Sequence, residues 1–199
     1  MTLPEGRVWL RVADPLWTQP LDPSFAAATG GRWNPPDSFP VLYLNADVGT
    51  ARLQIDRMVE DQPFTADDLA DDAYLLIAAT LPRSQTCADA VSRTGLQALG
   101  LPPSYPLGAS GRRVERAVCQ SIGAEVHDAG LRGVWCRSAA SPLHRGRELA
   151  WFPASARSRA RPIWTEGQPF GQWRDATRWA DIGLTEQTDP APTRLKDPS

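Results

Sequence analysis

The sequence is poor in cysteine, in long apolar runs and in net charge, and each shortage excludes a class of protein. Three cysteines, Cys87, Cys119 and Cys136, are an odd number without the close pairing of a zinc site. We expect them to be buried as small hydrophobic side chains. The formal net charge of −2 makes no case for direct binding of nucleic acid.

Apolar residues do not gather into long runs anywhere in the chain. Residues 1–17 contain no apolar stretch typical of a signal peptide, and no segment approaches the length that spans a membrane. We therefore expect a cytoplasmic protein with no membrane partner. At 199 residues and 42% hydrophobic content, the chain is long enough to bury a substantial core. A single domain over residues 1–184 is expected, and the proline-rich polar residues 185–199 predict a disordered tail.

Short apolar segments alternate with two helical patterns along the chain. Strands are predicted at residues 7–12, 41–45, 74–81, 133–137 and 148–152. One helix is predicted to begin at Asp47 or Thr50. A second covers residues 114–129, and Gly130 suits a left-handed cap at its end. The apolar residues that recur at helical spacing and predict its packed face are Val114, Ala117, Val118, Ile122, Val126 and Ala129. Residues 83–111 are expected to form a surface connection with one short helix near 95–99.

The most distinctive stretch is the turn from Gly30 to Pro36, which projects Arg32. Two glycines allow the backbone to approach a ligand closely, and two prolines stiffen the far side. A guanidinium held in this way suits bidentate binding of a phosphate. The alternative is an ordinary Gly/Pro turn whose arginine is merely solvated. A second group of six arginines between Arg137 and Arg161 either frames an anion or is ordinary surface charge.

The first predicted helix places Gln54 beside its apolar face. Ala51, Ile55, Met58 and Val59 recur at helical spacing, and Gln54 lies at the edge of the same face, toward the interior or a cleft rim. An acidic run follows between Asp56 and Asp72, which is typical of a solvated face but also suits a basic partner.

In order and spacing, these motifs resemble the RES domain, a family of toxins from bacterial toxin–antitoxin pairs. The resemblance covers about residues 7 to 155 and rests on several motifs: Arg11 after the first strand, Gly-Arg-Trp-Asn-Pro at 31–35, Leu-Tyr-Leu at 42–44, a helix near Thr50-Ala51, Gly-Val-Trp-Cys-Arg-Ser at 133–138, and Leu-Ala-Trp-Phe at 149–152. It implies an α+β fold, a compact mixed α/β domain with a mainly antiparallel sheet related in shape to ADP-ribosyltransferases. It also implies NAD as substrate without a metal, and an antitoxin partner with a helix-turn-helix DNA-binding region.

Carried over by position, the resemblance assigns four catalytic residues. The family arginine matches Arg32, its tyrosine matches Tyr43 and its serine matches Ser138, while Gln54 stands where the family has a glutamate. Arg11, Arg32, Tyr43 and Ser138 are expected to contact NAD. Two simpler interpretations stay open: Tyr43 as a core residue, and Ser138 as a strand-end hydroxyl bonded to backbone.

The glutamine matters because the expected chemistry calls for negative charge. Breaking the nicotinamide–ribose bond builds an oxocarbenium-like cation, which a nearby carboxylate stabilises. Asp56 cannot take the place of residue 54, since it lies about 200° further around the helix. Glu148, on another element, is a second candidate acid. Three functions follow: an NAD glycohydrolase or phosphorylase, an ADP-ribosyltransferase acting on a protein, or a non-catalytic member that binds NAD or a protein.

Overall fold

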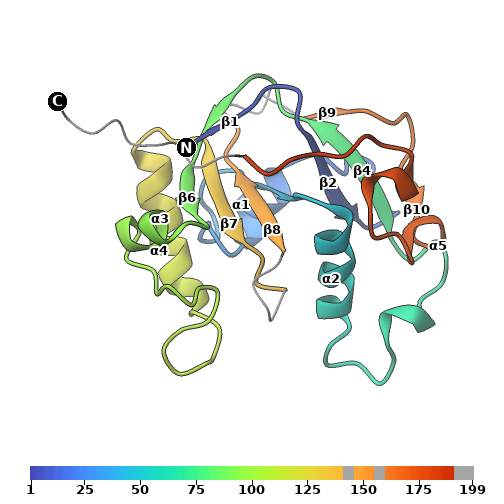
Figure 1. The fold of residues 1–199 in the computed structure, drawn as a ribbon, viewed down its shortest axis with the longest axis horizontal. Coiled ribbons are helices and arrows are strands. Elements are labelled where there is room, and N and C mark those ends of the chain that lie inside the picture. Colours follow the sequence, from blue (N-terminus) through green and yellow to red (C-terminus); the bar gives the residue numbers. More distant parts are fainter. Residues whose placement is uncertain (141–145, 155–159, 191–199) are drawn as a thin grey trace.

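The computed structural model describes residues 1–140, 146–154 and 160–190, and one mixed sheet runs through them (Figure 1). The neighbouring strands, in spatial order, are β10 (Gln168–Pro169), β4 (Leu75–Thr80), β2 (Val8–Ala13), β3 (Leu42–Asn45), β8 (Arg147–Trp151), β7 (Gly133–Arg137) and β6 (Ala88–Ala90). β9 (Arg161–Pro162) also pairs with β4, and β1 (Thr2–Leu3) pairs separately with β5 (Gln85–Thr86). Every described pair is antiparallel except β6 with β7. The expected mixed fold with a mainly antiparallel sheet is confirmed.

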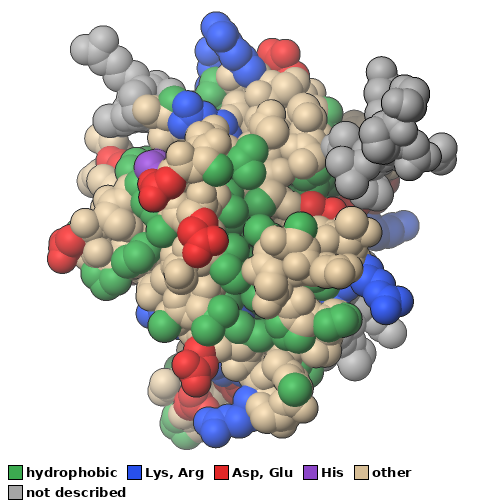
Figure 2. Space-filling view, turned by 90° about the vertical axis from the view of Figure 1, so that its left-hand side faces the viewer, with side chains coloured by type: hydrophobic (Ala, Val, Ile, Leu, Met, Phe, Trp, Pro, Cys, Tyr) green, Lys and Arg blue, Asp and Glu red, His purple; other side chains and the backbone are tan. Residues whose placement is uncertain are grey.

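Helices cover the two ends of the sheet separately. The helices are α1 (Ser24–Thr29), α2 (Val48–Met58), α3 (Arg93–Ala98), α4 (Arg116–Asp128) and α5 (Phe170–Trp173), with 3₁₀ turns at Ala66–Asp68 and Trp179–Ile182. α3 and α4 lie beside β6 and β7, whereas α2 and α5 lie toward β2 and β4 (Figure 1). On the outer face formed by α3 and α4, hydrophobic side chains lie among polar ones and basic side chains lie toward the margins (Figure 2).

Three clusters of buried side chains hold these layers together. One joins α2 and α5 to β2 and β4 around Phe170 and Trp173, and a second joins α4 to β7 and β8 around Trp33 and Phe152. A third cluster, which includes Trp9, Trp135 and Trp151, packs on the opposite face of the central strands. The three cysteines are buried, as expected. No helix among the described residues is long and apolar enough to cross a membrane.

Most predicted elements are present, and the exceptions have local causes. Asp47 caps α2 by accepting a hydrogen bond from the Thr50 amide at 2.7 Å, as expected. The connection 83–111 also contains the strands β5 and β6. The sequence does not predict them, because strands of three or fewer residues are too short to show an alternating pattern. The packing face predicted for α4 is wrong at its start, because Val118 is exposed and lies off the buried stripe of Cys119, Ile122, Gly123 and Val126. The face predicted for α2 is wrong at Met58, which is exposed at the end of the helix.

The end of the described chain lies against β2. The amide of Val8 donates to the Gln187 side chain at 3.2 Å, and Arg7 donates to the Thr188 carbonyl and to Asp189. Residues 191–199, which hold most of the predicted tail, lie outside the described residues. The division of the chain at residue 185 therefore stays a prediction.

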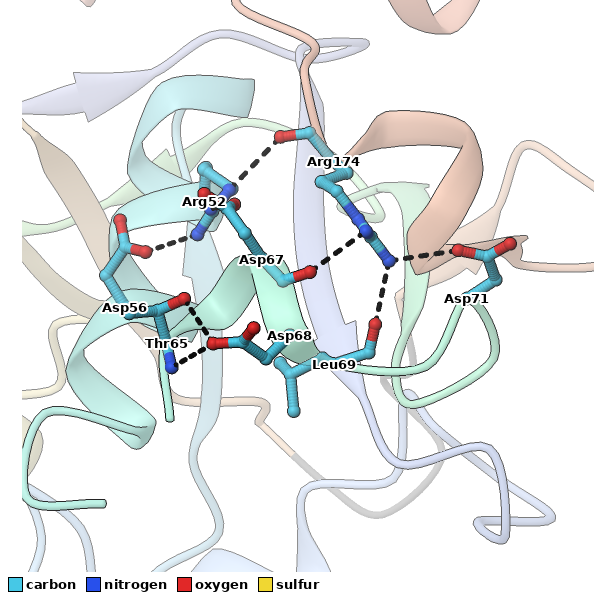
Figure 3. Close-up of polar contacts among 8 residues, drawn as sticks. All are labelled: Arg52, Asp56, Thr65, Asp67, Asp68, Leu69, Asp71 and Arg174. Carbon is cyan, nitrogen blue, oxygen red and sulfur yellow. Dashed lines mark hydrogen bonds and ion pairs between the residues drawn. The ribbon is translucent and has the colours of Figure 1, made fainter. Parts of the chain in front are cut away.

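Two arginines pair with part of the acidic run (Figure 3). Arg52 of α2 pairs with Asp56 and with Asp67, the latter at 2.6 Å. Arg174, after α5, donates to the carbonyls of Asp67 and Leu69 and to the Asp71 carboxylate at 2.8–3.1 Å. Both guanidinium groups also lie over the ring of Phe170. These contacts connect part of the acidic run to α2 and to the residue that follows α5, while its carboxylates stay largely exposed, as expected of a solvated face.

Arg174→Ala is expected to lower the free energy of unfolding by about 2 kcal/mol, since it leaves two backbone carbonyls and a carboxylate without their charged donor. The matched control is Arg178→Ala, whose exposed ion pair with Asp181 is worth about 0.5 kcal/mol or less. Urea denaturation of both variants measures the difference. Equal, small losses would contradict a structural role for Arg174.

Candidate functional site

A cleft of about 510 Å³ opens where β2 and β3 diverge. These two strands share one register pair, Leu10 with Asn45, whereas β2 and β4 stay paired along their whole length. Its walls come from several parts of the chain: both strands, Trp17, α1, the Gly30–Arg32 turn, the C-terminal half of α2, the start of α4, residues 139–140 and β8. Its volume is in the range of small-molecule sites. The lining residues that carry charge are Arg11, Arg32, Arg57, Arg113, Arg116 and Glu148.

This charge pattern selects for an anionic ligand. Among the residues that the structure describes, five arginines and one carboxylate line the cleft. Arg57 and Arg113 are partly compensated by Glu60 at the rim, the latter at 3.9 Å. Arginine is the side chain best suited to phosphate oxygens, because its planar fork matches them. The site therefore suits a phosphate-bearing molecule with a positive or polar region near the single carboxylate.

The turn that carries Arg32 is held from β3. The Tyr43 hydroxyl accepts a hydrogen bond from the Trp33 amide at 2.8 Å and donates to Asn34 Oδ1 at 2.9 Å. Burial raises the pKa of Tyr43, so the phenol keeps its proton. The ring lies so close to Gly31 that a Cβ there would come within 2.2 Å of the hydroxyl oxygen. This glycine is required by close packing.

α4 holds the same turn from the other side. Gln120 donates to the carbonyls of Gly31 and Asn34 at 2.9 and 3.1 Å. Gly123 lies directly against the Trp33 carbonyl, where a Cβ would come within 1.8 Å of the oxygen. The turn is therefore clamped between a strand and a helix that are far apart in sequence.

Arg32 itself is half-buried and fixed by two contacts. Its Nε donates to the Tyr105 hydroxyl and its Nη2 to the Val114 carbonyl, both at 3.2 Å. In the described part of the chain, Nη1 has no hydrogen-bond partner, and Arg32 lines the cleft. The side chain is thus positioned with donor capacity to spare for a ligand.

Arg11 bridges the two diverging strands. Its Nη1 donates to the Tyr43 carbonyl at 3.3 Å, and the guanidinium lies 5.4 Å from the ring centre of Trp17. Burial lowers the pKa of Arg11 to about 10, which still leaves it charged at neutral pH. Its Nε is buried and has no partner among residues that the structure describes.

Gln54 also lines the cleft, and it is held by Asn45. The Asn45 amide donates to Gln54 Oε1 at 2.7 Å. Asn45 is buried, and its own Oδ1 has no protein partner among the described residues. Residue 54 therefore contributes amide groups to the cleft and no charge. Asp56 points elsewhere, toward Arg52, as the helical geometry predicted.

Ser138 lies beneath the cleft wall. It is fully buried at the end of β7, and its hydroxyl donates to Glu148 Oε1 while accepting from the Ala140 amide at 3.1 Å. Glu148 on β8 lines the cleft directly. Burial raises the pKa of Glu148, and the hydrogen bond from Ser138 and the charge of Arg32 oppose that rise. Ser138 thus reaches the cleft through Glu148.

The structure brings together the predicted residues and adds others. Arg11, Arg32, Tyr43 and Gln54 line one cleft, and Ser138 contacts the acid that completes it. Sequence reasoning did not single out Asn45, Tyr105 or Arg116. Asn45 could have been noticed as a polar residue at the end of an apolar strand. Tyr105 and Arg116 give no such signal, because their segments approach the turn only in the folded chain.

The fold and the cleft together define an α+β domain with an arginine-lined cleft where two central strands separate. The chain belongs to the RES domain family, whose sequence pattern matches residues 7–172. A chain in the crystal structure of the M. tuberculosis MbcT–MbcA toxin–antitoxin complex has a similar fold, with a TM-score of 0.69. The two share 19% identity over 87% of this chain and 90% of that chain. No curated protein matches the sequence.

Proposed function

We propose that the protein is a RES-type toxin that consumes NAD by cleaving the bond between nicotinamide and ribose. The observation that carries this proposal is the cleft that five arginines and one carboxylate line among the described residues. NAD has the complementary charges, because its diphosphate is anionic and its nicotinamide ring is cationic. Membership of the RES family supports the same substrate.

Each residue of the cleft has a role that follows from its position. Arg32 and Arg11 bind diphosphate oxygens, since both are charged, fixed and in the cleft wall. Tyr43 orients the Arg32 turn and presents its ring beside it. Nicotinamide leaves as a neutral molecule, so no strong general acid is needed. Catalysis then depends on holding the ribose and stabilising the cation that develops on it.

The test is release of nicotinamide from NAD by the purified protein, beside Arg32→Ala. Loss of Arg32 is expected to reduce turnover by about 100-fold or more, because a preorganised charged donor is removed. Arg93→Ala, an exposed arginine on α3 outside the cleft, is the matched control and keeps full activity. Equal turnover in both variants would contradict the assignment of Arg32.

The acceptor of ADP-ribose separates the remaining candidate functions. Free ADP-ribose as product identifies a glycohydrolase, and ADP-ribose 1″-phosphate identifies a phosphorylase. A stable mass increment on a protein would identify a transferase. Binding of NAD without turnover would identify a non-catalytic member, the function that Gln54 favours by its lack of charge.

A partner antitoxin with a helix-turn-helix DNA-binding region belongs to the same proposal. The RES family and the fold shared with a chain of a toxin–antitoxin complex support it. Expression of the protein alone in bacteria is expected to deplete cellular NAD, and co-expression with the product of an adjacent gene is expected to prevent the depletion. Unchanged NAD in cells that express the protein alone would count against a toxin.

A further inference from the structure

In the described part of the chain, one carboxylate lines the cleft, and it comes from β8 and not from the helix that carries residue 54. We propose that Glu148 of β8 is a catalytic residue that supplies the negative charge for the reaction, while Gln54 contributes only hydrogen bonds to the substrate. The inference rests on the proposed function and assigns to a strand the charge that the family pattern places on a helix.

The strand register brings Glu148 to the same place as Gln54. Asn45 of β3 is directly opposite Glu148 of β8, so their side chains lie on one face of the sheet. Asn45 also donates to Gln54 across the cleft floor at 2.7 Å. Asn45 therefore lies beside both candidate groups, and Glu148 reaches the site from the strand while Gln54 reaches it from α2.

A hydrogen bond connects the first turn of α2 to the start of β8, next to Glu148. The Thr50 hydroxyl in the first turn of α2 accepts a hydrogen bond from the Arg147 amide at 3.2 Å. Gly146 allows the approach, because a Cβ there would come within 3.0 Å of both the Thr50 hydroxyl and Ser138. The distance between the strand acid and the helix is thus set by backbone packing.

The carboxyl of Glu148 is oriented as a fixed acceptor. Ser138 holds Oε1 from below. Among the described residues Oε2 has no hydrogen-bond partner, and Glu148 lines the cleft. Arg32, Tyr43 and Cys136 are the titratable or charged groups around the carboxyl, and Arg32 alone among them carries a charge that favours its ionised form. Ser138 is accordingly a positioning residue that acts through Glu148.

Cleavage of the nicotinamide–ribose bond gives the negative charge of Glu148 a function. The bond between ribose C1′ and the nicotinamide nitrogen breaks, and its electron pair leaves with nicotinamide. Positive charge then spreads over C1′ and the ribose ring oxygen, where the Glu148 carboxylate stabilises it. Water, or phosphate, adds to C1′ to complete the reaction, and water releases one proton on doing so. Glu148 gains no covalent bond in this scheme.

The buried negative charge of Glu148 is expected to lower the free energy of unfolding. A variant that removes only this charge therefore distinguishes a catalytic role from a structural one. Burial raises the pKa of Glu148, so the free energy of unfolding falls as pH rises from the ordinary glutamate pKa through the raised one. Glu148→Gln keeps the acceptor oxygen for Ser138 and removes the charge. This variant is expected to retain the melting temperature at neutral pH or to raise it by about 2–4 °C.

The experiment measures nicotinamide release and melting temperature for the full-length protein and three variants. Glu148→Gln is expected to lower kcat by about 100- to 1000-fold. Moving the charge, in Glu148→Gln/Gln54→Glu, is expected to recover about tenfold of that loss, because a carboxylate at 54 still accepts from Asn45. Glu125→Gln, an exposed acid on α4 outside the cleft, is the control and keeps full activity.

The outcomes distinguish this inference from the proposed function. If the parent protein is active and the kcat of Glu148→Gln stays within about threefold of the parent's, the role of Glu148 is overturned and the proposed function is not. A lower melting temperature in Glu148→Gln, with no recovery in the double variant, would make the residue structural and would also overturn the inference. A parent protein that releases no nicotinamide would overturn both proposals.

Discussion

Gly123→Ala is expected to lower the free energy of unfolding by about 3 kcal/mol, although alanine is the better helix former. The added Cβ would meet the Trp33 carbonyl oxygen at 1.8 Å and its carbon at 2.7 Å. Both are backbone atoms, which cannot swing aside as a side chain can. α4 must therefore move away from the turn, and the buried cluster around Trp33 and Ile122 opens with it.

The same movement is expected to reduce nicotinamide release, because Gln120 loses its contacts with the turn that carries Arg32. Gly108→Ala is the matched control, since a Cβ at that position meets nothing closer than 3.6 Å. Urea denaturation measures the stability of both variants. A Gly123→Ala protein as stable as Gly108→Ala would show that α4 is not packed against the turn as described.

Tyr43→Phe is expected to lower the free energy of unfolding by about 3 kcal/mol, because one hydroxyl serves two buried partners. Without it the Trp33 amide and Asn34 Oδ1 lose their hydrogen bonds, and both residues are almost fully buried. The turn then relaxes around Arg32, and a displacement of about 1 Å is enough to reduce turnover by about 100-fold.

Tyr74→Phe provides the comparison for this variant. Tyr74 is half-buried against the cluster around Phe170, and its hydroxyl has no hydrogen-bond partner among the described residues. Its loss is expected to change the free energy of unfolding by about 0.5 kcal/mol or less. Thermal melts and nicotinamide release, run on both variants, measure the contrast. If Tyr43→Phe behaved like Tyr74→Phe, the turn would have to be held by α4 alone.

The local elements of this fold could be predicted because their signals are local. Asp47 caps α2 by accepting a hydrogen bond from an amide three residues away. The apolar runs of β4 and β7 predict buried strands from their own residues alone. The resemblance to the RES domain likewise rests on the order of short motifs, and it placed Arg11, Arg32, Tyr43 and Gln54 in what the structure shows to be one cleft.

Contacts between distant segments could not be predicted in the same way. α1 is only six residues long and β6 only three, so neither shows a helical or strand pattern in the sequence, and β6 becomes a strand by pairing with β7. The side chains of the acidic run are exposed, as its pattern predicts for a solvated face. No local pattern predicts that Arg174, more than 100 residues away, binds the carbonyl of Asp67 and the carboxylate of Asp71.

The sequence by itself determined the family, the order of the strands along the chain and the missing charge at residue 54, since each of these is written in consecutive residues. Only the tertiary structure decided which acid lies in the cleft. Glu148 follows Gln54 by more than 90 residues, and the two are brought together by the pairing of β3 with β8 and by the packing of α2 on Gly146. The charged side chains can be counted from a sequence. The distance of each charge from a ligand depends on backbone contacts between distant segments, which no local pattern predicts.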